Sequence, residues 1–213
     1  MVSSKIPGRT SDKPQQQQGV SNILRDRRLW GLAAANALVM TLYTLWTNWT
    51  TVFFVERFHL TEAAANRQFA WIPPLFATLG GFAGGWMAYR AISGKTAVLD
   101  ARLRVSTIAS LILLLTAAVP FMPTPALAAV FVSLSFFCCL AISTNLYAMP
   151  IDFFGPAHAA FGVAILTGSY GLMQTVLSPL IGSMVDHLGF QGVCVTLAVM
   201  PLAGVGILRW TSK

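Results

Sequence analysis

The sequence predicts an all-α transmembrane protein with six helices, and three observations indicate this fold class. First, 55% of the 213 residues are hydrophobic and only 10% are charged, whereas a soluble domain carries about 25% charged residues. Second, the apolar residues gather into six long runs with no Asp, Glu, Lys or Arg inside them. Third, the basic residues fall mainly in alternate connections between these runs. The runs cover 29–55, 68–89, 105–122, 126–149, 159–185 and 190–208.

Each run has a length suited to a membrane-spanning helix, because crossing the hydrocarbon core takes about 20 residues. A helix satisfies its own backbone hydrogen bonds in lipid, and none of the runs shows the alternation of a barrel strand. The preceding segment, 1–28, is polar and basic, with a run of glutamines at Gln15–Gln18. We therefore expect 1–28 to be a flexible cytoplasmic tail or linker without a signal peptide, and 29–211 to be one transmembrane domain.

The distribution of Lys and Arg predicts the orientation. If the N-terminus is cytoplasmic, the cytoplasmic segments hold twelve of the fourteen basic residues, and only Arg57 and Arg67 lie on the opposite side. Such a bias is typical of cytoplasmic loops. Both termini are therefore predicted to be cytoplasmic.

The second run, which contains LGGFAGGW, has two pairs of glycines spaced four residues apart. Gly80 pairs with Gly84, and Gly81 pairs with Gly85. Glycines at this spacing let membrane helices pack closely, so we expect a packing face here. Gly168 and Gly171 of the fifth run provide a second small-residue face for close packing.

A weak internal repeat links the ends of the second and fifth runs. GWMAYR and GSMVDH share the pattern Gly-x-Met-x-x-basic at an offset of 97 residues, and Thr78 matches Thr175 at the same offset. This repeat fits a chain built as two triplets of helices, which is the inverted-repeat organisation of many transporters.

Six helices, the repeat and three sequence motifs together resemble the C-terminal half of a major facilitator superfamily transporter. GGWMAYRAISGK is similar to the loop between the second and third helices of each half, although Tyr89 stands where the family has Asp before the arginine. DARLR and YAMPIDFFGPAHAAFGVA are similar to segments of the anion:cation symporter branch, which includes hexuronate and other sugar-acid carriers. The loop residues that this resemblance marks as structural or gating are Gly85, Arg90, Gly94, Lys95, Arg102 and Arg104.

The resemblance implies a role in secondary active transport of a small organic anion, such as a sugar acid, by alternating access. It implies a bacterial inner-membrane protein that acts with a proton or a sodium ion as coupling ion. A complete carrier of this family has twelve helices, so the resemblance also implies a missing N-terminal six-helix half. In the family, the first, second, fourth and fifth helices of each half line the central cavity, and the third and sixth pack outside.

Helical spacing identifies the polar side chains that could line such a cavity. Apolar membrane helices usually turn a single polar face toward protein or water, and residues that share a face recur every three or four positions. The first and fifth runs each carry such a face, and Trp46 lies near the polar face of the first run. Asn145 of the fourth run could either line the cavity or cap its helix. The candidates are Asn36, Tyr43, Trp46, Thr47, Thr50, Asn145, Thr167, Tyr170 and Gln174. Asn48 points elsewhere on an ideal helix.

The six runs contain no charged residue. An anion needs cationic or aligned donors, and ion coupling usually needs a membrane-embedded carboxylate or histidine. We therefore expect those groups in the absent half, with neutral hydrogen bonds and ring stacking in this one. No catalytic residue, metal, cofactor or nucleic acid is expected, because the three cysteines lie in apolar runs without metal-ligand spacing and the basic residues do not share one face.

Three other interpretations stay open. The chain could be a non-transporting membrane subunit, such as a sensor or assembly factor. It could also be a half-transporter that forms a homodimer. The third is a membrane serine protease, suggested faintly by GSYG at Gly168–Gly171, but that chemistry needs a histidine base, and the run 190–208 contains no histidine.

Overall fold

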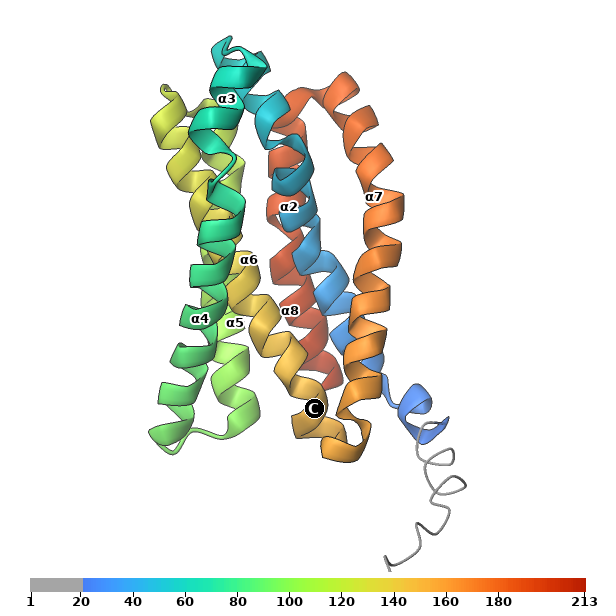
Figure 1. Ribbon diagram of the computed structural model, residues 1–213. Helices are drawn as coiled ribbons and strands as arrows, with labels where there is room; N and C mark the ends of the chain where they lie inside the picture. Colours follow the sequence, from blue (N-terminus) through green and yellow to red (C-terminus); the bar gives the residue numbers. More distant parts are fainter. Residues whose placement is uncertain (1–20) are drawn as a thin grey trace, which may run out of the picture.

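The computed structural model describes residues 21–213, and this part of the chain contains helices and turns but no strand. The helices form an elongated bundle in which the long elements run up and down between two ends (Figure 1). The chain is thus an all-α protein, as predicted. Its elements are α2 (Arg27–Phe58), α3 (Glu62–Phe69), α4 (Ile72–Ser93), α5 (Val98–Leu113), the 3₁₀ helix η1 (Leu114–Phe121), α6 (Pro125–Phe154), α7 (Pro156–Ala198) and α8 (Met200–Thr211).

Several helices begin at a side chain that caps the free backbone donors of the first turn. Asp26 accepts a hydrogen bond from the Arg28 amide at 2.8 Å at the start of α2. Thr61 does the same for the Ala64 amide at 3.2 Å before α3, and Thr124 for the Leu127 amide at 3.3 Å before α6. These caps set where the helices start after each connection.

The fifth and sixth runs are joined at Gly189. Gly189 has φ 65° and ψ 174°, a non-helical conformation within α7 that glycine adopts without steric cost. The chain turns back there, so that the end of α7 and α8 descend beside α2 (Figure 1). The run 159–185 lies in the limb before Gly189, and the run 190–208 lies in the limb after it.

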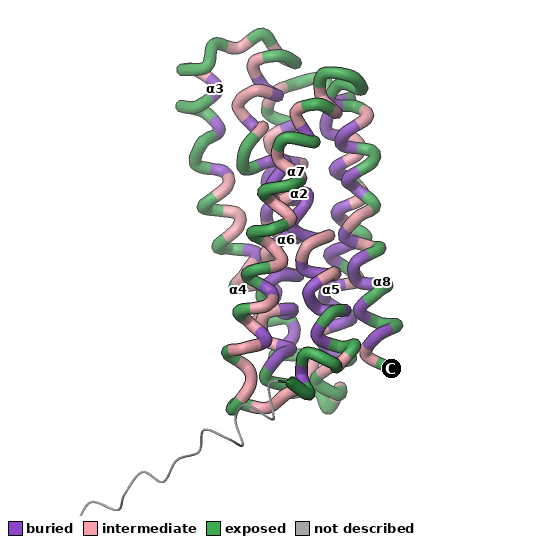
Figure 2. The backbone as a smooth tube through the Cα atoms, turned by 90° about the vertical axis from the view of Figure 1, so that its right-hand side faces the viewer, coloured by how far each residue is buried: buried purple, intermediate pink, exposed green. Residues whose placement is uncertain are grey.

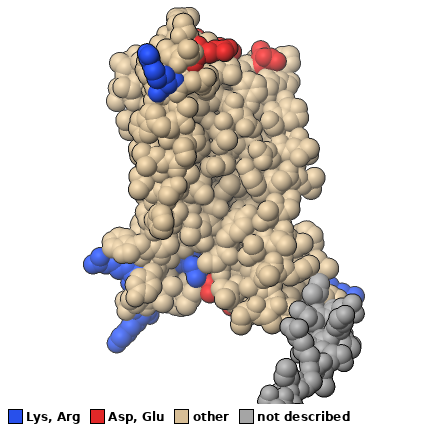
Figure 3. Space-filling model, viewed as in Figure 1, with Lys and Arg blue, Asp and Glu red and all other residues tan. Residues whose placement is uncertain are grey.

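Four helical stretches of the described residues are long and apolar enough to cross a membrane. They are Arg27–Phe58, Val98–Phe121, Pro125–Phe154 and Pro156–Thr211, and the last contains both limbs around Gly189. The helix α4 is not among them, because its glycines, prolines, tryptophan and tyrosine lower its hydropathy. In the view of Figure 3 the charged side chains gather at the two ends of the bundle and leave the middle uncharged. This pattern is that of an integral membrane protein.

The core lies around α2, which packs against α6, α7 and α8. Large side chains on α2 and α6 are fully buried there, including Trp46, Phe53, Phe54 and Phe136. Buried residues follow the inner sides of the helices in Figure 2.

The helix α4 packs on α6 through glycine. A Cβ at Gly80 would overlap the backbone carbonyl of Phe137, and one at Gly84 would overlap that of Ala141. Only glycine permits this approach of two backbones. The face of α4 that carries Gly80 and Gly84 is therefore a packing face.

Candidate functional site

One side of the bundle presents uncharged polar side chains from three helices. In Figure 1, α4 and α7 stand at the two sides of the bundle, with α2 and α6 between them. We define the polar face as the half-buried or exposed side chains of Tyr43 and Thr47 on α2, Thr144 and Tyr147 on α6, and Thr167, Tyr170 and Gln174 on α7. Five of these seven are sequence candidates, and Thr144 and Tyr147 are additions from the structure.

Three tyrosines lie at the centre of the polar face. Tyr170 of α7 interacts electrostatically with both Tyr43 of α2 and Tyr147 of α6. The Thr167 hydroxyl donates to the Tyr147 hydroxyl across 3.4 Å. The Tyr43 ring rests edge-on against the buried ring of Phe136, with centroids 5.6 Å apart. This cluster can donate and accept hydrogen bonds without carrying charge.

A groove extends the polar face toward α4. It has a volume of about 390 Å³ and opens between α4 and α6, and its lining residues are Ala77, Thr78, Gly81, Phe82, Leu140 and Thr144. Leu140, Thr144 and Tyr147 follow one another at helical spacing on α6. The groove and the tyrosine cluster therefore meet along the same side of α6. Gly81 lies at the edge of this groove, with the Thr144 hydroxyl 3.3 Å from the position of an added Cβ.

Two candidates from the α2 polar stripe belong to the core. Trp46 is fully buried and meets Phe53 edge-on at 5.5 Å between ring centroids. Thr50 is 7% exposed, and its hydroxyl donates to the Trp46 carbonyl. In this half both side chains therefore lie inside the bundle and not on the polar face. The exposed pair on the same helix is Thr47 and Asn48, and Asn48 donates to the Ser178 hydroxyl of α7 at 3.5 Å.

The two asparagine candidates connect helices inside the bundle. Asn36 is fully buried and donates from Nδ2 to the Leu166 carbonyl of α7 at 2.9 Å. Asn145 is also fully buried and donates to the carbonyls of Gly84, at 3.1 Å, and Ala141, at 2.9 Å. Side-chain hydrogen bonds of this kind hold membrane helices together. The structure therefore places Asn36 and Asn145 away from the polar face, and neither caps a helix end.

The two candidate packing glycines of the fifth run, Gly168 and Gly171, have open space around them. Gly168 and Gly171 are exposed, and an added Cβ would meet nothing within 4 Å. They lie on α7 beside Thr167 and Tyr170, at the border of the polar face. Among residues 21–213 they contact no neighbouring helix closely, unlike Gly80 and Gly84.

The basic loop residues lie at the end of the bundle where α2 begins and α8 ends (Figure 1). The Arg90 guanidinium stacks over the Trp86 ring, 5.2 Å from its centroid. Gly94 caps α4, and Lys95 follows with φ 69°. Arg102 of α5 donates to Asp152 of α6 at 2.7 Å. The loop therefore consists of separate local contacts rather than one charge cluster.

The Arg102–Asp152 ion pair connects α5 to the end of α6, and we expect a double-mutant cycle to measure its strength. Arg102→Gln, Asp152→Asn and the double variant should give a coupling free energy of about 0.2–1 kcal/mol, because both side chains remain partly solvated. The measurement is thermal or denaturant unfolding in detergent micelles. Additive effects of the two single variants would show that the pair contributes nothing.

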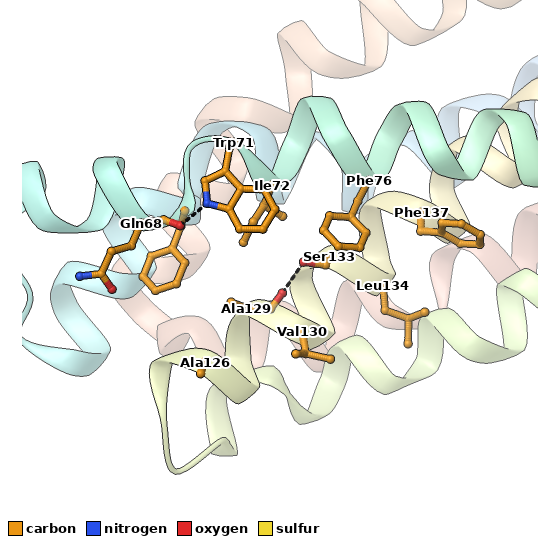
Figure 4. A pocket seen from close by; sticks show the side chains of 11 residues that line it. Gln68, Trp71, Ile72, Phe76, Ala126, Ala129, Val130, Ser133, Leu134 and Phe137 are labelled. Atoms are coloured by element: carbon orange, nitrogen blue, oxygen red, sulfur yellow. Dashed lines mark hydrogen bonds between the residues drawn. The ribbon is translucent and has the colours of Figure 1, made fainter.

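The pocket between the start of α4 and α6 has different chemistry. It has a volume of about 560 Å³ and is lined by apolar side chains such as Phe76, Val130 and Leu134 (Figure 4). Two of its polar groups are already bonded within the chain, because Trp71 donates to the Gln68 carbonyl at 2.5 Å and Ser133 to the Ala129 carbonyl at 2.7 Å. Such a pocket is poorly suited to an anion.

The polar face itself contains no ionisable side chain other than its tyrosines. Charged residues of α2, α4, α6 and α7 lie near helix ends, as Figure 3 shows for one side of the molecule. No group of three or more metal-ligating side chains occurs among residues 21–213. Ser169, the serine of GSYG, donates to the backbone carbonyls of Leu166, at 2.7 Å, and Ala33, at 3.3 Å. Its hydroxyl thus bonds to backbone acceptors and not to a base.

Comparison with known proteins finds similarity to hexuronate and galacturonate transporters. The chain is 27% identical over 200 residues to the hexuronate transporters of Escherichia coli K12 and of E. coli O157:H7, a match that covers 92% of this chain and 45% of each relative. A galacturonate transporter of Dickeya chrysanthemi is 39% identical over 67 residues, which is 30% of this chain and 19% of that protein. No family model matches the chain.

These relatives are named as transporters, and the chain spans about half of the length of the hexuronate transporters. Together with the apolar helices, they identify an integral membrane protein. The resemblance to sugar-acid carriers that the sequence motifs indicated is confirmed, and the extent of the match is consistent with the C-terminal half of a transporter of the major facilitator type.

Proposed function

We propose that this chain provides the C-terminal half of a secondary active transporter for small organic anions of the sugar-acid class. Support comes from two sources. The relatives carry the names of hexuronate and galacturonate transporters. The polar face offers several neutral hydroxyl groups, which suit the hydroxyls of a sugar ring.

The tyrosine cluster is the observation that carries the proposal. Tyr43, Tyr147 and Tyr170 come from three helices, Tyr170 interacts electrostatically with the other two, and each combines an aromatic ring with a hydroxyl. Tyrosine is favoured where one part of a ligand is apolar and another is polar. A sugar acid has this character, because its C–H faces stack on rings and its hydroxyls form hydrogen bonds.

We further propose that the groups for charge recognition reside in another six-helix half. A sugar-acid carboxylate requires cationic or aligned donors, and the polar face supplies none with a charge. The second half would bring the cation and the group that couples transport to a proton or a sodium ion. The two halves would alternate access by rocking about the bound substrate, in the inner membrane of a bacterium.

The proposal can be tested by uptake of radiolabelled galacturonate into cells. This chain is expressed alone, and also together with the N-terminal six-helix half of the E. coli K12 hexuronate transporter. Co-purification first establishes that the two pieces assemble. Uptake is expected only from the assembled pair, and dissipating the proton gradient or removing sodium should identify the coupling ion.

Two results would contradict the proposal. Uptake by the chain alone would refute the role as a half, and a cross-linked dimer would then indicate a homodimeric carrier. No uptake of any hexuronate by a demonstrably assembled pair would favour a non-transporting subunit.

A further inference from the structure

A further cavity lies between α5 and α8, at the end of the bundle where α2 begins and α8 ends. It has a volume of about 630 Å³, and its lining residues are Leu99, Asp100, Leu103, Arg104, Gly206, Arg209, Trp210, Ser212 and Lys213. The helices α4 and α8 stand on opposite sides of the bundle in Figure 2. This cavity is therefore separate from the polar face and from the groove beside α4.

The charge in this cavity is predominantly positive. Arg104, Arg209 and Lys213 bring three cations, whereas Asp100 brings one carboxylate. If the chain ends at Lys213, a terminal carboxylate is added and the cavity keeps a net positive charge. Within residues 21–213 the only ion pair joins Arg102 to Asp152, so Arg104 and Arg209 are available to bind an anion.

Apolar stripes run from this cavity along the outer sides of both helices. On α5 and η1, Ile108, Leu111 and Leu115 follow Arg104 at spacings of four, three and four residues and are about half exposed. On the α8 side, Val199 and Ile207 are exposed on the face that ends at Trp210. Residues at these spacings share one face of a helix. The basic side chains therefore lie at one end of an exposed apolar surface.

The exposed indole of Trp210 places the cavity at the level of the membrane interface. Its side chain is 73% exposed, and tryptophan is enriched where the hydrocarbon core meets the headgroups. Long arginine side chains reach the same level from within a helix. Basic pockets between membrane helices at this depth are sites where anionic lipid headgroups bind.

We propose that the cavity between α5 and α8 binds the headgroup of an anionic phospholipid, of the phosphatidylglycerol type. The phosphate accepts hydrogen bonds from Arg104 and Arg209, with Lys213 adding charge. The Asp100 carboxylate is placed to accept hydrogen bonds from the glycerol hydroxyls. The Ser212 hydroxyl is placed to accept or to donate hydrogen bonds with them. The acyl chains lie on the apolar stripes of α5 and α8. A free phosphate ion would use the same cations but would leave both stripes uncovered.

The test is native mass spectrometry of the purified chain released from nanodiscs that contain equal amounts of phosphatidylglycerol, phosphatidylethanolamine and phosphatidylcholine. The wild-type chain is expected to retain phosphatidylglycerol in preference to both zwitterionic lipids. The variant Arg104→Gln/Arg209→Gln should lower that preference about tenfold or more, because each basic residue near a membrane surface contributes about 1 kcal/mol. The control, Arg90→Gln/Lys95→Gln, removes the same amount of charge at the same end of the bundle. This control variant should retain the preference for phosphatidylglycerol.

A second pair of variants fills the cavity without changing charge. A Cβ at Gly206 would meet nothing within 4 Å, and the same is true of Gly171 on α7. Gly206→Leu is therefore expected to fold and to displace the lipid, while Gly171→Leu should fold and retain it. Circular dichroism and the melting temperature establish that all variants are folded.

The outcomes separate the possible ligands. Equal retention of phosphatidylglycerol by the charge variant and its control, or equal loss from both, would overturn the proposal. Equal retention of phosphatidylethanolamine and phosphatidylglycerol by the wild type would overturn the preference for an anionic lipid. Displacement of phosphatidylglycerol by millimolar inorganic phosphate would show that the cavity takes the free ion.

Discussion

Replacing Gly80 by alanine is expected to lower the free energy of unfolding by about 1–3 kcal/mol, the usual cost of overpacking a close-packed interior. The new Cβ would overlap the Phe137 carbonyl, which is part of the α6 backbone and cannot rotate away. The two helices would have to separate, and this movement would also disturb the contact of Gly84 with Ala141. Thermal unfolding of the purified chain in detergent micelles measures the effect.

Gly85→Ala is the matched control, because it makes the same change on the same helix. Its added Cβ would lie 3.7 Å from the Thr144 methyl group, an ordinary van der Waals distance. In a helix interior, alanine is more favourable than glycine by about 0.5–1 kcal/mol, so Gly85→Ala should be neutral or stabilising. If both variants unfold at the same temperature, the close approach of α4 and α6 is not required for stability.

The fold class could be predicted from the sequence because membrane insertion leaves a simple signal. Apolar runs without charges mark the spans, and the first run, 29–55, lies entirely within α2. Glycine spacing also indicated close packing of the second run, since only a residue without a side chain lets two backbones meet. The connections carried weaker signals. The short helix α3 and the 3₁₀ helix η1, which forms the last part of the third run and contains Pro120, were not foreseen.

The site was less predictable because helical spacing shows which residues share one face of a helix. It does not show whether that face points to the core or to the surface of the bundle. Tyr43, Thr47 and Thr50 share a face on an ideal helix, but α2 is enclosed by three other helices, so part of that face is core. Trp46 and Thr50 turned inward for this reason, and Asn48 remained exposed. Tyr147 was missed although Thr144 lies three residues before it on the same face of α6. Its other neighbours on the polar face come from α2 and α7, and a single sequence does not reveal contacts between helices.

Replacing Tyr170 by phenylalanine is expected to lower kcat/KM for hexuronate uptake by about tenfold or more in the assembled transporter. The change removes one hydroxyl from the tyrosine cluster and keeps the ring, so the fold should be unaffected. A polar group of the substrate that loses its hydrogen-bond partner in a closed site costs about 1–3 kcal/mol. Tyr147→Phe should have a similar effect, because Tyr147 lies in the same cluster.

Tyr89→Phe provides the control, since Tyr89 is 69% exposed near the end of α4 and lies outside the polar face. Its uptake kinetics should match those of the wild type. Tyr43→Phe adds a second comparison within the cluster, because the edge-on contact of that ring with Phe136 survives the loss of the hydroxyl. If Tyr43→Phe, Tyr147→Phe and Tyr170→Phe all transport like Tyr89→Phe, the tyrosines serve packing alone, and the substrate must be recognised elsewhere. A loss confined to the three cluster variants would instead locate hydrogen bonding to the sugar acid at the polar face of this half.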